Sequence, residues 1–568
     1  MTARRAGRSA GTRPSGIARS AEPGPTLTQA GSAPSLGRAD ALLPYVVAVI
    51  VLLILKSVLP PYTCDDAFIS MKVAVNLAEG RGMTFNPGEA AYVTTSPLWV
   101  LLLAAGRTVT GDVLVASRWI VTVLEVLLVI VFVHLTSGLS RGRRIGAISA
   151  VLLVTNPAFL LTSSSGMELP LYLLVIVLSI DLFRTGHYAV ALAVAATAVW
   201  VRFDGVLLYG VLAASVLIVQ RRELRTRLVR VLAGYLPSVL ILLAYILFGY
   251  LVFDMMVPAS VQRKALSSPN LFSAKWQAGA MTLAAAFGQA CLGNNAAWYR
   301  AGTPFLILFL PFLVGMTLFA VRRQRGTFVL LVFSVVYFLA LTGSGAGYTR
   351  NFPWYFVPVL PAVCLAAGTG LVWILERFSE ASKRFRALWD MAVPELVFIV
   401  VWTVVLYFGA IQTNTAVLAQ SAIGTAERER AYAAAAVWAG RNLDPNATVA
   451  ANEIGAVGFF LPPDAEVLDM FGLLRPPTEL KTSWSVLFKR QPPELVITRR
   501  FFAYRKSIER NFPNRYRWGT FRTVELGLRR DIARKYAAQL QELPMIYRDI
   551  DVSREWPWAP RPPHILSP

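Results

Sequence analysis

The segment 64–99, CDDAFISMKVAVNLAEGRGMTFNPGEAAYVTTSPLW, follows the first long apolar run of the chain and is far more polar than its surroundings. It opens with two adjacent carboxylates, Asp65 and Asp66. Ionisable groups this close to a lipid bilayer are costly to keep, so they indicate a functional site. Apolar side chains then recur at helical spacing, and Gly80 and Gly82 follow them. We therefore expect a helix over 66–79 that lies along the membrane surface, with the Asp pair at its N-terminus.

The composition around this segment is that of an integral membrane protein. Of the 568 residues, 55% are hydrophobic and only 15% are charged, and the mean hydropathy is +0.53. A soluble protein would carry roughly a quarter charged residues. Apolar runs long enough to cross a hydrocarbon core of about 30 Å recur along the chain. We predict a polytopic α-helical membrane protein with about eleven spans, at 42–59, 113–136, 145–162, 169–183, 187–201, 205–220, 231–253, 303–321, 327–342, 353–375 and 394–411, and a shorter interfacial helix at 97–108.

The charges between the spans predict the orientation. If residues 1–40, a basic segment expected to be disordered, are cytoplasmic, every loop on the inside is basic, as the positive-inside rule requires. These loops contain Arg141, Arg143, Arg144, Arg184, the run 221–230, Arg322, Arg323, Arg325, Arg377, Lys383, Arg384 and Arg386. The membrane domain then covers 41–411. The loop 60–112 and the tail 412–568 lie outside.

The net charge of +22 does not indicate a nucleic-acid partner. Much of the excess lies in the inside loops and the N-terminal segment, where anionic lipid headgroups explain it, and no nucleic-acid-binding motif accompanies it. The chain has three cysteines. Cys64 and Cys291 both fall on the predicted outer side, so a disulfide between them is an option, and two unpaired thiols are at least as consistent with the sequence.

The Asp pair has a catalytic and a structural interpretation. Transfer of a group to a hydroxyl needs a base that takes the hydroxyl proton, and repulsion between neighbouring carboxylates raises the pKa of one of them. In the structural interpretation, one Asp caps the helix at 66–79, which would explain one carboxylate but not two. A divalent cation held by the pair is a further option, although no His cluster supports it. His134, His187 and His564 receive no role.

The other outer loops carry charges where a phosphate headgroup would arrive. Glu168 lies in SSSGMELP, Arg202 and Asp204 in VRFDG, Arg263 and Lys264 in MMVPASVQRKAL, and Arg350 in GSGAGYTRNFPWYF. The planar guanidinium of Arg makes paired bonds to phosphate oxygens, so these cations suit a lipid-linked phosphate. For Arg202, a local pair with Asp204, or a side chain that reaches to the interface, is an equally good explanation.

The tail from 412 has the pattern of a small α/β domain. It shows helical periodicity near 427–441, and VAANEIGAVGFFLPPDAEVLDMFGL then predicts a strand, a Gly-containing turn, a strand and a helix. PELVIT, at 493–498, predicts another buried strand. Asn452, Glu453 and Asp469 fall at strand ends, where polar residues bind ligands or form turns. We favour turn formation.

Together these motifs resemble the GT-C superfamily of membrane glycosyltransferases, which use polyprenyl-phosphate-linked sugars. The order of the motifs along the chain is similar to that in the branch of the mycobacterial terminal arabinofuranosyltransferases. The matching pieces run from about 45 to 475: DDAFISMKVAVNLAEGRGMTFNPGE, TTSPLW, SGMELPLYL, VRFDG, MMVPASVQRKA, NEIGAVGFF and VLDMFGLLRP.

The resemblance implies a multi-pass protein of a bacterial inner membrane, with its active site on the outer face beneath a periplasmic C-terminal domain. It implies a base at Asp65 or Asp66, with Asp65 the first choice, and a donor site lined by Glu168, Arg202 and Lys264. Inverting transfer would move the sugar to a glycan, lipid or protein acceptor and release polyprenyl phosphate. GYTRNFPWYF stands where the arabinofuranosyltransferases carry an Asp and a His, and WYFVPVLP is similar to enzymes that move hexoses, so arabinofuranose and a hexose both remain.

Other classes of membrane protein compete with a transferase. A transporter or flippase of lipid-linked sugars would place ionisable groups near the bilayer midplane in repeated halves. This chain has no evident repeat, and its charges gather at the outer loops. A ligase or polymerase that uses a diphosphate-linked oligosaccharide would share the lipid carrier but not the donor.

Overall fold

The computed structural model describes residues 38–58, 62–89, 91–139, 141–226, 228–262, 303–322, 325–343, 353–381, 386–387, 412–475, 479, 482–500 and 504–550. Contacts divide the chain into Met1–Leu43 and Pro44–Pro568. The helices from residue 44 onward and the C-terminal sheet thus lie in the same compact unit. The domain boundary at 412 stays a prediction.

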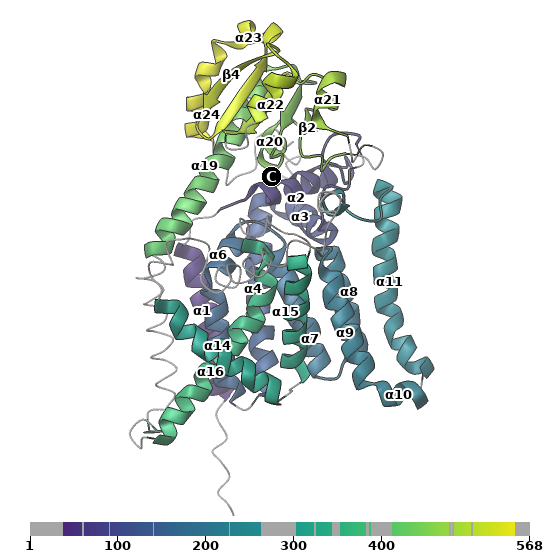
Figure 1. Ribbon diagram of the computed structural model, residues 1–568, viewed down its shortest axis with the longest axis vertical. Helices are drawn as coiled ribbons and strands as arrows, with labels where there is room; N and C mark the ends of the chain where they lie inside the picture. Colours follow the sequence, from purple (N-terminus) through teal and green to yellow (C-terminus); the bar gives the residue numbers. More distant parts are fainter. Residues whose placement is uncertain are drawn as a thin grey trace, which may run out of the picture. The chain divides into compact units, whose positions relative to one another are not determined.

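Helices occupy every predicted span up to residue 375 (Figure 1). They are α1 (Arg38–Val58), α4 (Val113–Leu135), α5 (Gly142–Val154) with α6 (Pro157–Ser164), α7 (Leu169–Arg184), α8 (Tyr188–Val201), α9 (Gly205–Val219), α11 (Leu228–Phe253), α14 (Thr303–Arg322), α15 (Arg325–Gly343) and α16 (Leu360–Ala381), the last preceded by the 3-10 turns η3 (Pro353–Tyr355) and η4 (Val357–Val359). The short helix α10 (Arg221–Thr226) joins α9 to α11. The shorter helix predicted at 97–108 is present as α3 (Pro97–Thr110), and its place at the membrane interface stays a prediction. The span predicted at 394–411 lies outside the described residues.

Helix length supports the predicted number of spans only in part. Among the described residues, Val113–Gly138, Leu232–Phe253 and Val357–Ala381 are long and apolar enough to cross a membrane. Gly142–Val154 and Ala158–Ser164, bent by 60°, would form a fourth span if taken together. At 1.5 Å per residue, the 14 to 16 residues of α7, α8 and α9 rise only about 21–24 Å, short of a hydrocarbon core of about 30 Å. The count of about eleven spans therefore stays a prediction.

A buried ion pair ties α1 to α4 inside the helical bundle. Lys56 Nζ lies 2.5 Å from Glu125 Oε2, and the Glu125 side chain is fully buried. A carboxylate in an otherwise apolar helix is expensive unless it is paired. This contact was not predicted, although a single Glu within an apolar span is the signal that could have revealed it.

The C-terminal part folds around a mixed sheet. Its strands are β1 (Thr448–Ala451), β2 (Glu466–Asp469), β3 (Leu495–Arg499), β4 (Tyr516–Phe521) and β5 (Val524–Arg529), in the order β2-β1-β3-β5-β4. β1 pairs in parallel with β2 and β3, whereas β5 is antiparallel to β3 and β4. The helices around the sheet are α19 (Gln412–Asn442), α20 (Gly455–Phe460), α21 (Trp484–Arg490), α22 (Tyr504–Asn511), α23 (Arg530–Tyr536) and α24 (Leu543–Asp549).

The sheet confirms some predicted elements and corrects others. PELVIT forms β3, and the periodicity at 427–441 lies within α19. The predicted Gly-containing turn is wrong, because residues 455–460 form the helix α20. The helix predicted after β2 is also wrong, since bends follow at 470–475. In that segment the Asp469 carboxylate accepts the backbone N–H groups of Phe471 at 2.7 Å and Leu474 at 3.1 Å, which stabilises a turn.

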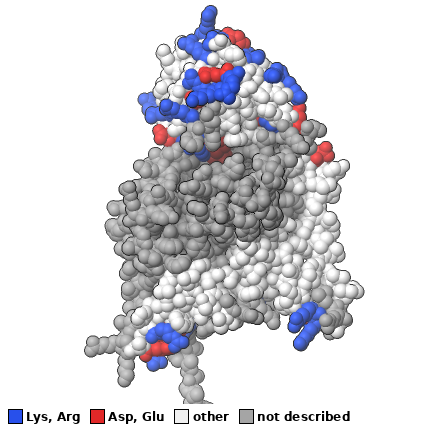
Figure 2. Space-filling view, in the orientation of Figure 1, with Lys and Arg blue, Asp and Glu red and all other residues white. Residues whose placement is uncertain are grey.

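Charged side chains mark two regions of the visible surface. In Figure 2, Lys and Arg gather over the sheet and again at the ends of α10 and α16, where Arg377 and Glu380 form an exposed pair. Much of the described surface between these regions is formed by other residue types. This distribution is the one expected of a protein with a lipid-facing belt.

Candidate functional site

Asp65 and Asp66 begin the helix α2 (Asp65–Ala78), close to the predicted limits. The helix is capped by Cys64 without a side-chain bond, so the interpretation of one Asp as its N-cap is wrong. Both carboxylates lie in the first turn, where the helix dipole favours negative charge. Their surroundings differ, because Asp66 is exposed whereas Asp65 is only 6% exposed. The two groups are therefore suited to different tasks.

The Asp65 carboxylate contacts the start of α20, and Figure 1 shows the two helices next to each other. Asp65 Oδ1 accepts the backbone N–H of Ala456 at 2.8 Å, and Oδ2 accepts that of Gly455 at 3.1 Å. These N–H groups have no partner within their own helix, so an acidic side chain from elsewhere satisfies them. Most of α2 is buried beneath this contact, and α2 is thus more enclosed than a helix on a membrane surface.

A buried cluster of charges surrounds Asp65. Its backbone N–H donates to Glu429 Oε1 at 3.1 Å, and Glu429 in turn pairs with Arg428. Arg428 also lies 3.5 Å from Glu453, one of the predicted strand-end residues. Burial, reinforced by the negative charge of Glu453 and opposed by Arg428 and the backbone N–H bonds, raises the pKa of Asp65 to about 8. Burial likewise raises the pKa of Glu429 to about 7.

The raised pKa of Asp65 predicts that this contact weakens as the pH rises. When the contact is broken, the carboxyl titrates near its ordinary pKa of 3.8, so the closed form holds a proton that the open form loses. The proton-linked stability is complete below about pH 4 and is lost progressively up to about pH 8. The charges that face the group are Arg428, Glu429 and Glu453. The midpoint of thermal unfolding in detergent should therefore fall between about pH 5 and 8.5, and fall less in Asp65→Asn. Equal slopes in both proteins would contradict the assignment.

Further contacts join the segment after α2 to the same part of the sheet domain. Asn86 Nδ2 donates to Val467 O at 2.9 Å, and Asn86 Oδ1 accepts Val467 N–H at 3.0 Å, so the side chain pairs with the edge strand β2 as a neighbouring strand would. The centre of the Phe68 ring lies 5.1 Å from the ring centre of Phe459 and 5.4 Å from that of Phe460. No pattern in the sequence indicated this face of α20.

Three of the predicted donor-site residues come together at the ends of α7, α8 and α9. Arg202 Nη1 lies 2.6 Å from Glu168 Oε1, and Arg202 Nε lies 3.2 Å from Asp204 Oδ1. Tyr337 donates its hydroxyl to Asp204 Oδ2 at 2.9 Å. The Arg202 guanidinium also lies 5.9 Å from the ring centre of Tyr172. The local Arg202–Asp204 pair, considered as an alternative from the sequence, is thus present, and Glu168 extends it.

Direct backbone contacts connect the Glu168 loop to the start of α2. Cys64 N–H donates to Ser165 O at 3.1 Å. Gly166, with φ +80°, lies so close that an added Cβ would be 2.9 Å from Met71 Cε and 3.4 Å from Ala67 Cβ. The start of α2 is therefore adjacent to the loop that carries Glu168.

The segment that ends just before Arg263 and Lys264 contacts the loop 60–112. Ala259 N–H donates to Tyr92 O at 3.2 Å, which places the chain before residue 262 against the loop 60–112. Arg263, Lys264 and Arg350 lie outside the described residues, as does Cys291. The role of these cations in binding a donor therefore stays a prediction. Cys64 is a buried free cysteine, which agrees with the alternative of unpaired thiols.

The predicted strand-end residues have structural contacts. Asn452 Oδ1 accepts the backbone N–H of Arg499 at 3.0 Å and so joins the ends of β1 and β3. Burial raises the pKa of the Asp469 carboxyl, against the effect of the backbone N–H bonds it accepts. Asp469 thus shapes a turn, whereas Asn452 joins two strands and Glu453 lies 3.5 Å from Arg428. Within the described part of the chain, no group of three or more His, Cys, Asp and Glu side chains could hold a metal ion.

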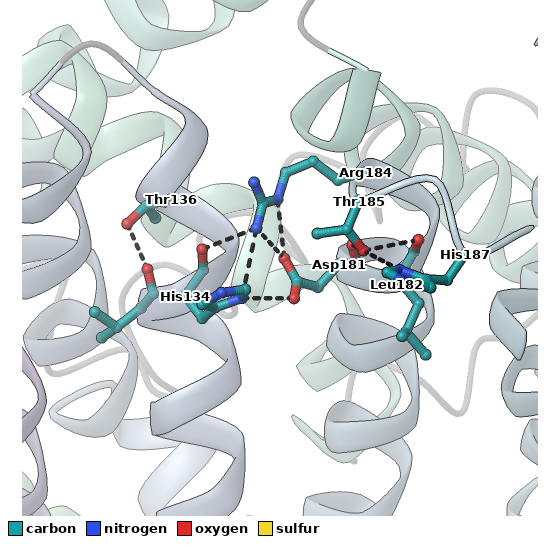
Figure 3. A network of polar contacts seen from close by, with 8 residues as sticks. His134, Thr136, Asp181, Leu182, Arg184, Thr185 and His187 are labelled. Atoms are coloured by element: carbon teal, nitrogen blue, oxygen red, sulfur yellow. Dashed lines mark hydrogen bonds and ion pairs between the residues drawn. The ribbon is translucent and has the colours of Figure 1, made fainter.

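A second polar network lies at the ends of α4 and α7 (Figure 3). His134 Nδ1 is 2.7 Å from Asp181 Oδ2, and Arg184 Nη2 is 2.7 Å from Asp181 Oδ1. Thr185 Oγ1 lies 3.0 Å from His187 Nδ1. Asp181 thus connects α7 to His134 of α4, whereas His187 contacts Thr185 two residues before it.

Comparison with known proteins shows the fold. Residues 420–540 match a family model described as a domain of unknown function, DUF8728, and no curated protein matches the chain. The crystal structure of ArnT from Cupriavidus metallidurans bound to undecaprenyl phosphate is similar to 87% of this chain and 98% of that one, with a TM-score of 0.50 at 14% identity. ArnT from the same organism in the apo state is similar over 86% and 97%, with a TM-score of 0.50 at 15% identity. The chain therefore has a fold similar to that of ArnT, while membership of the GT-C superfamily and of the arabinofuranosyltransferase branch stays a prediction.

Proposed function

We propose that the protein is an inverting glycosyltransferase that moves a sugar from a polyprenyl-phosphate donor to an acceptor on the outer face of a bacterial inner membrane. One observation carries the proposal. Within an ArnT-like helical fold, the Cys64–Ser165 backbone hydrogen bond connects the residue before the Asp pair to the loop that carries Glu168, the partner of Arg202. The crystallised ArnT binds undecaprenyl phosphate, which supports a lipid carrier of this kind. Arabinofuranose and a hexose are the candidate sugars, and a glycan, lipid or protein is the acceptor.

The reaction needs one base and one leaving group. The acceptor oxygen forms a bond to the anomeric carbon as the bond from that carbon to the phosphate oxygen breaks. Polyprenyl phosphate leaves with the electron pair, and a carboxylate takes the acceptor proton. We assign the base to Asp66, because its side chain is exposed whereas the Asp65 oxygens accept backbone N–H groups of α20. This assignment differs from the first choice made from the sequence.

The donor phosphate needs cations that are not already neutralised. All three side-chain nitrogens of Arg202 contact Glu168 or Asp204. Arg202 therefore shapes the donor site, and we propose that Arg263, Lys264 and Arg350 contact the phosphate oxygens. A divalent cation bound with the donor is an alternative source of this positive charge.

A donor screen tests the proposal. Purified protein in liposomes would receive polyprenyl-phosphate arabinose, mannose, glucose and galactose in turn, and the release of polyprenyl phosphate would be followed. Turnover of one donor that is lost in Asp66→Asn would support the enzyme class and identify the sugar. No turnover with any of the four, together with transfer from a diphosphate-linked oligosaccharide, would contradict the proposal and favour a ligase or polymerase. Movement of lipid-linked sugar across the bilayer without transfer would favour a flippase.

Lys264→Ala should raise the apparent KM for the donor by about 10-fold or more, because a charge-assisted bond to phosphate contributes about 1.5–3 kcal/mol. The value of kcat at saturating donor should change far less. Arg500→Ala, an exposed cation of the sheet domain, provides the matched control and should leave KM unchanged. An unaltered donor KM in Lys264→Ala would show that this residue does not bind the phosphate.

A further inference from the structure

The contact between Asp65 and α20 is unusually close at the level of the backbone. A Cβ added to Gly455 would lie 1.8 Å from the backbone oxygen of Asp65 and 2.9 Å from its Cγ. Only glycine fits at this position, because real side-chain carbons do not approach so near. The approach brings the Gly455 and Ala456 N–H groups onto the Asp65 carboxylate.

The same part of the sheet domain holds the segment after α2. A Cβ on Gly458 would lie 2.3 Å from Phe85 Cζ, so Phe85 packs directly on the backbone of α20. Asn86 then bonds to both backbone groups of Val467 in β2. We call these contacts the clamp: Asp65 with Gly455, Phe85 with Gly458, and Asn86 with Val467. They hold α2 at its first residue and also hold the segment that follows α2.

We propose that the C-terminal domain positions the catalytic residue, and that Asp65 is the positioning residue through which it does so. The proposal rests on the function proposed above. Asp66 follows Asp65 directly in the first turn of α2, so the place of its carboxylate is determined by the clamp. A misplacement of about 1 Å in a catalytic group can cost about 100-fold in rate. Binding of the lipid donor, which involves other loops, does not depend on the clamp.

Gly455→Ala tests the proposal while leaving both carboxylates in place. We expect kcat to fall by about 100-fold, with the donor KM changed by less than about 2-fold. Gly519→Ala is the matched control, because Gly519 lies in β4 of the same domain with nothing within 4 Å of an added Cβ. It should behave as the unaltered protein. Wild-type kcat in Gly455→Ala, or a donor KM raised in proportion to the loss of rate, would overturn the proposal.

Substitution of the clamp side chains by alanine tests the positioning role without introducing a clash with the backbone. Asp65→Ala and Asn86→Ala should both lower kcat without raising the donor KM, and Asp65→Ala should lower it more because it releases the helix start. Hydrogen–deuterium exchange provides a readout that does not need turnover. The Gly455 and Ala456 amides should exchange slowly in the unaltered protein and faster in Asp65→Ala.

The two readouts separate the proposals. Faster exchange together with the loss of kcat supports the positioning role. Unchanged exchange in Asp65→Ala overturns it, whatever the activity. Faster exchange in a protein whose unaltered form turns over no donor overturns the proposed function but supports the clamp as a structural contact.

Discussion

Asp66→Asn is expected to lower kcat by about 100- to 10,000-fold, the range that a lost general base produces. The amide has nearly the shape of the carboxylate but cannot take the acceptor proton. Because Asp66 is exposed, the substitution should leave the stability of the protein almost unchanged. Initial rates at saturating donor and acceptor, compared with the unfolding midpoint of the same preparation, would measure both.

Asp65→Asn provides the contrast. Its amide NH2 cannot accept one of the two backbone N–H groups that the Asp65 oxygens now accept, so the clamp should open even though Asp66 is intact. Amide exchange at Gly455 should therefore rise in Asp65→Asn and stay slow in Asp66→Asn. Full turnover by Asp66→Asn would remove it as the base. An inactive Asp65→Asn that keeps slow exchange would then return that role to Asp65.

Arg202→Ala is expected to destabilise the protein by about 3–5 kcal/mol, because it leaves a buried carboxylate without its partner. The Glu168 side chain is only 6% exposed and has Arg202 at 2.6 Å. Chemical or thermal unfolding in detergent would measure the loss. Arg377→Ala is the matched control, since the Arg377 and Glu380 side chains are 62% and 61% exposed, and exposed pairs contribute about 0–1 kcal/mol.

A second substitution separates stability from donor binding at the same network. Glu168→Gln added to Arg202→Ala removes the unpaired charge and should restore much of the lost stability. Donor affinity should not return with it, if Arg202 shapes the donor site. A double variant as unstable as Arg202→Ala would show that the cost comes from lost packing against Tyr172 rather than from Glu168.

Local elements were predictable from local sequence. The helix expected at 66–79 forms at Asp65–Ala78, and PELVIT forms β3, since each carries its own apolar period and end signals. The residues Glu168, Arg202 and Asp204 were chosen for their chemistry and do come together. Their mutual pairing was only half foreseen, because Glu168 is 34 residues from Arg202 and no periodicity links them.

The clamp could not be predicted in the same way. Gly455 and Gly458 indicated a turn, yet both lie in a helix where close approach of Asp65 and Phe85 excludes a side chain. Glycine serves both purposes, and only the tertiary partner tells them apart. The stripe of apolar residues on α2 likewise gave no sign that the opposite face would be covered by a domain far along the chain.

The separation of Asp65 from its partners has a consequence for synthesis. Gly455 follows Asp65 by 390 residues, so at about 5–20 residues per second the ribosome reaches it roughly 20 to 80 s later. During that interval the start of α2 stands at the membrane surface without the groups that complete it. Any nascent chain that terminates before Gly455 lacks them altogether. Only a chain that has been translated past Gly455 and Ala456 can therefore close this contact.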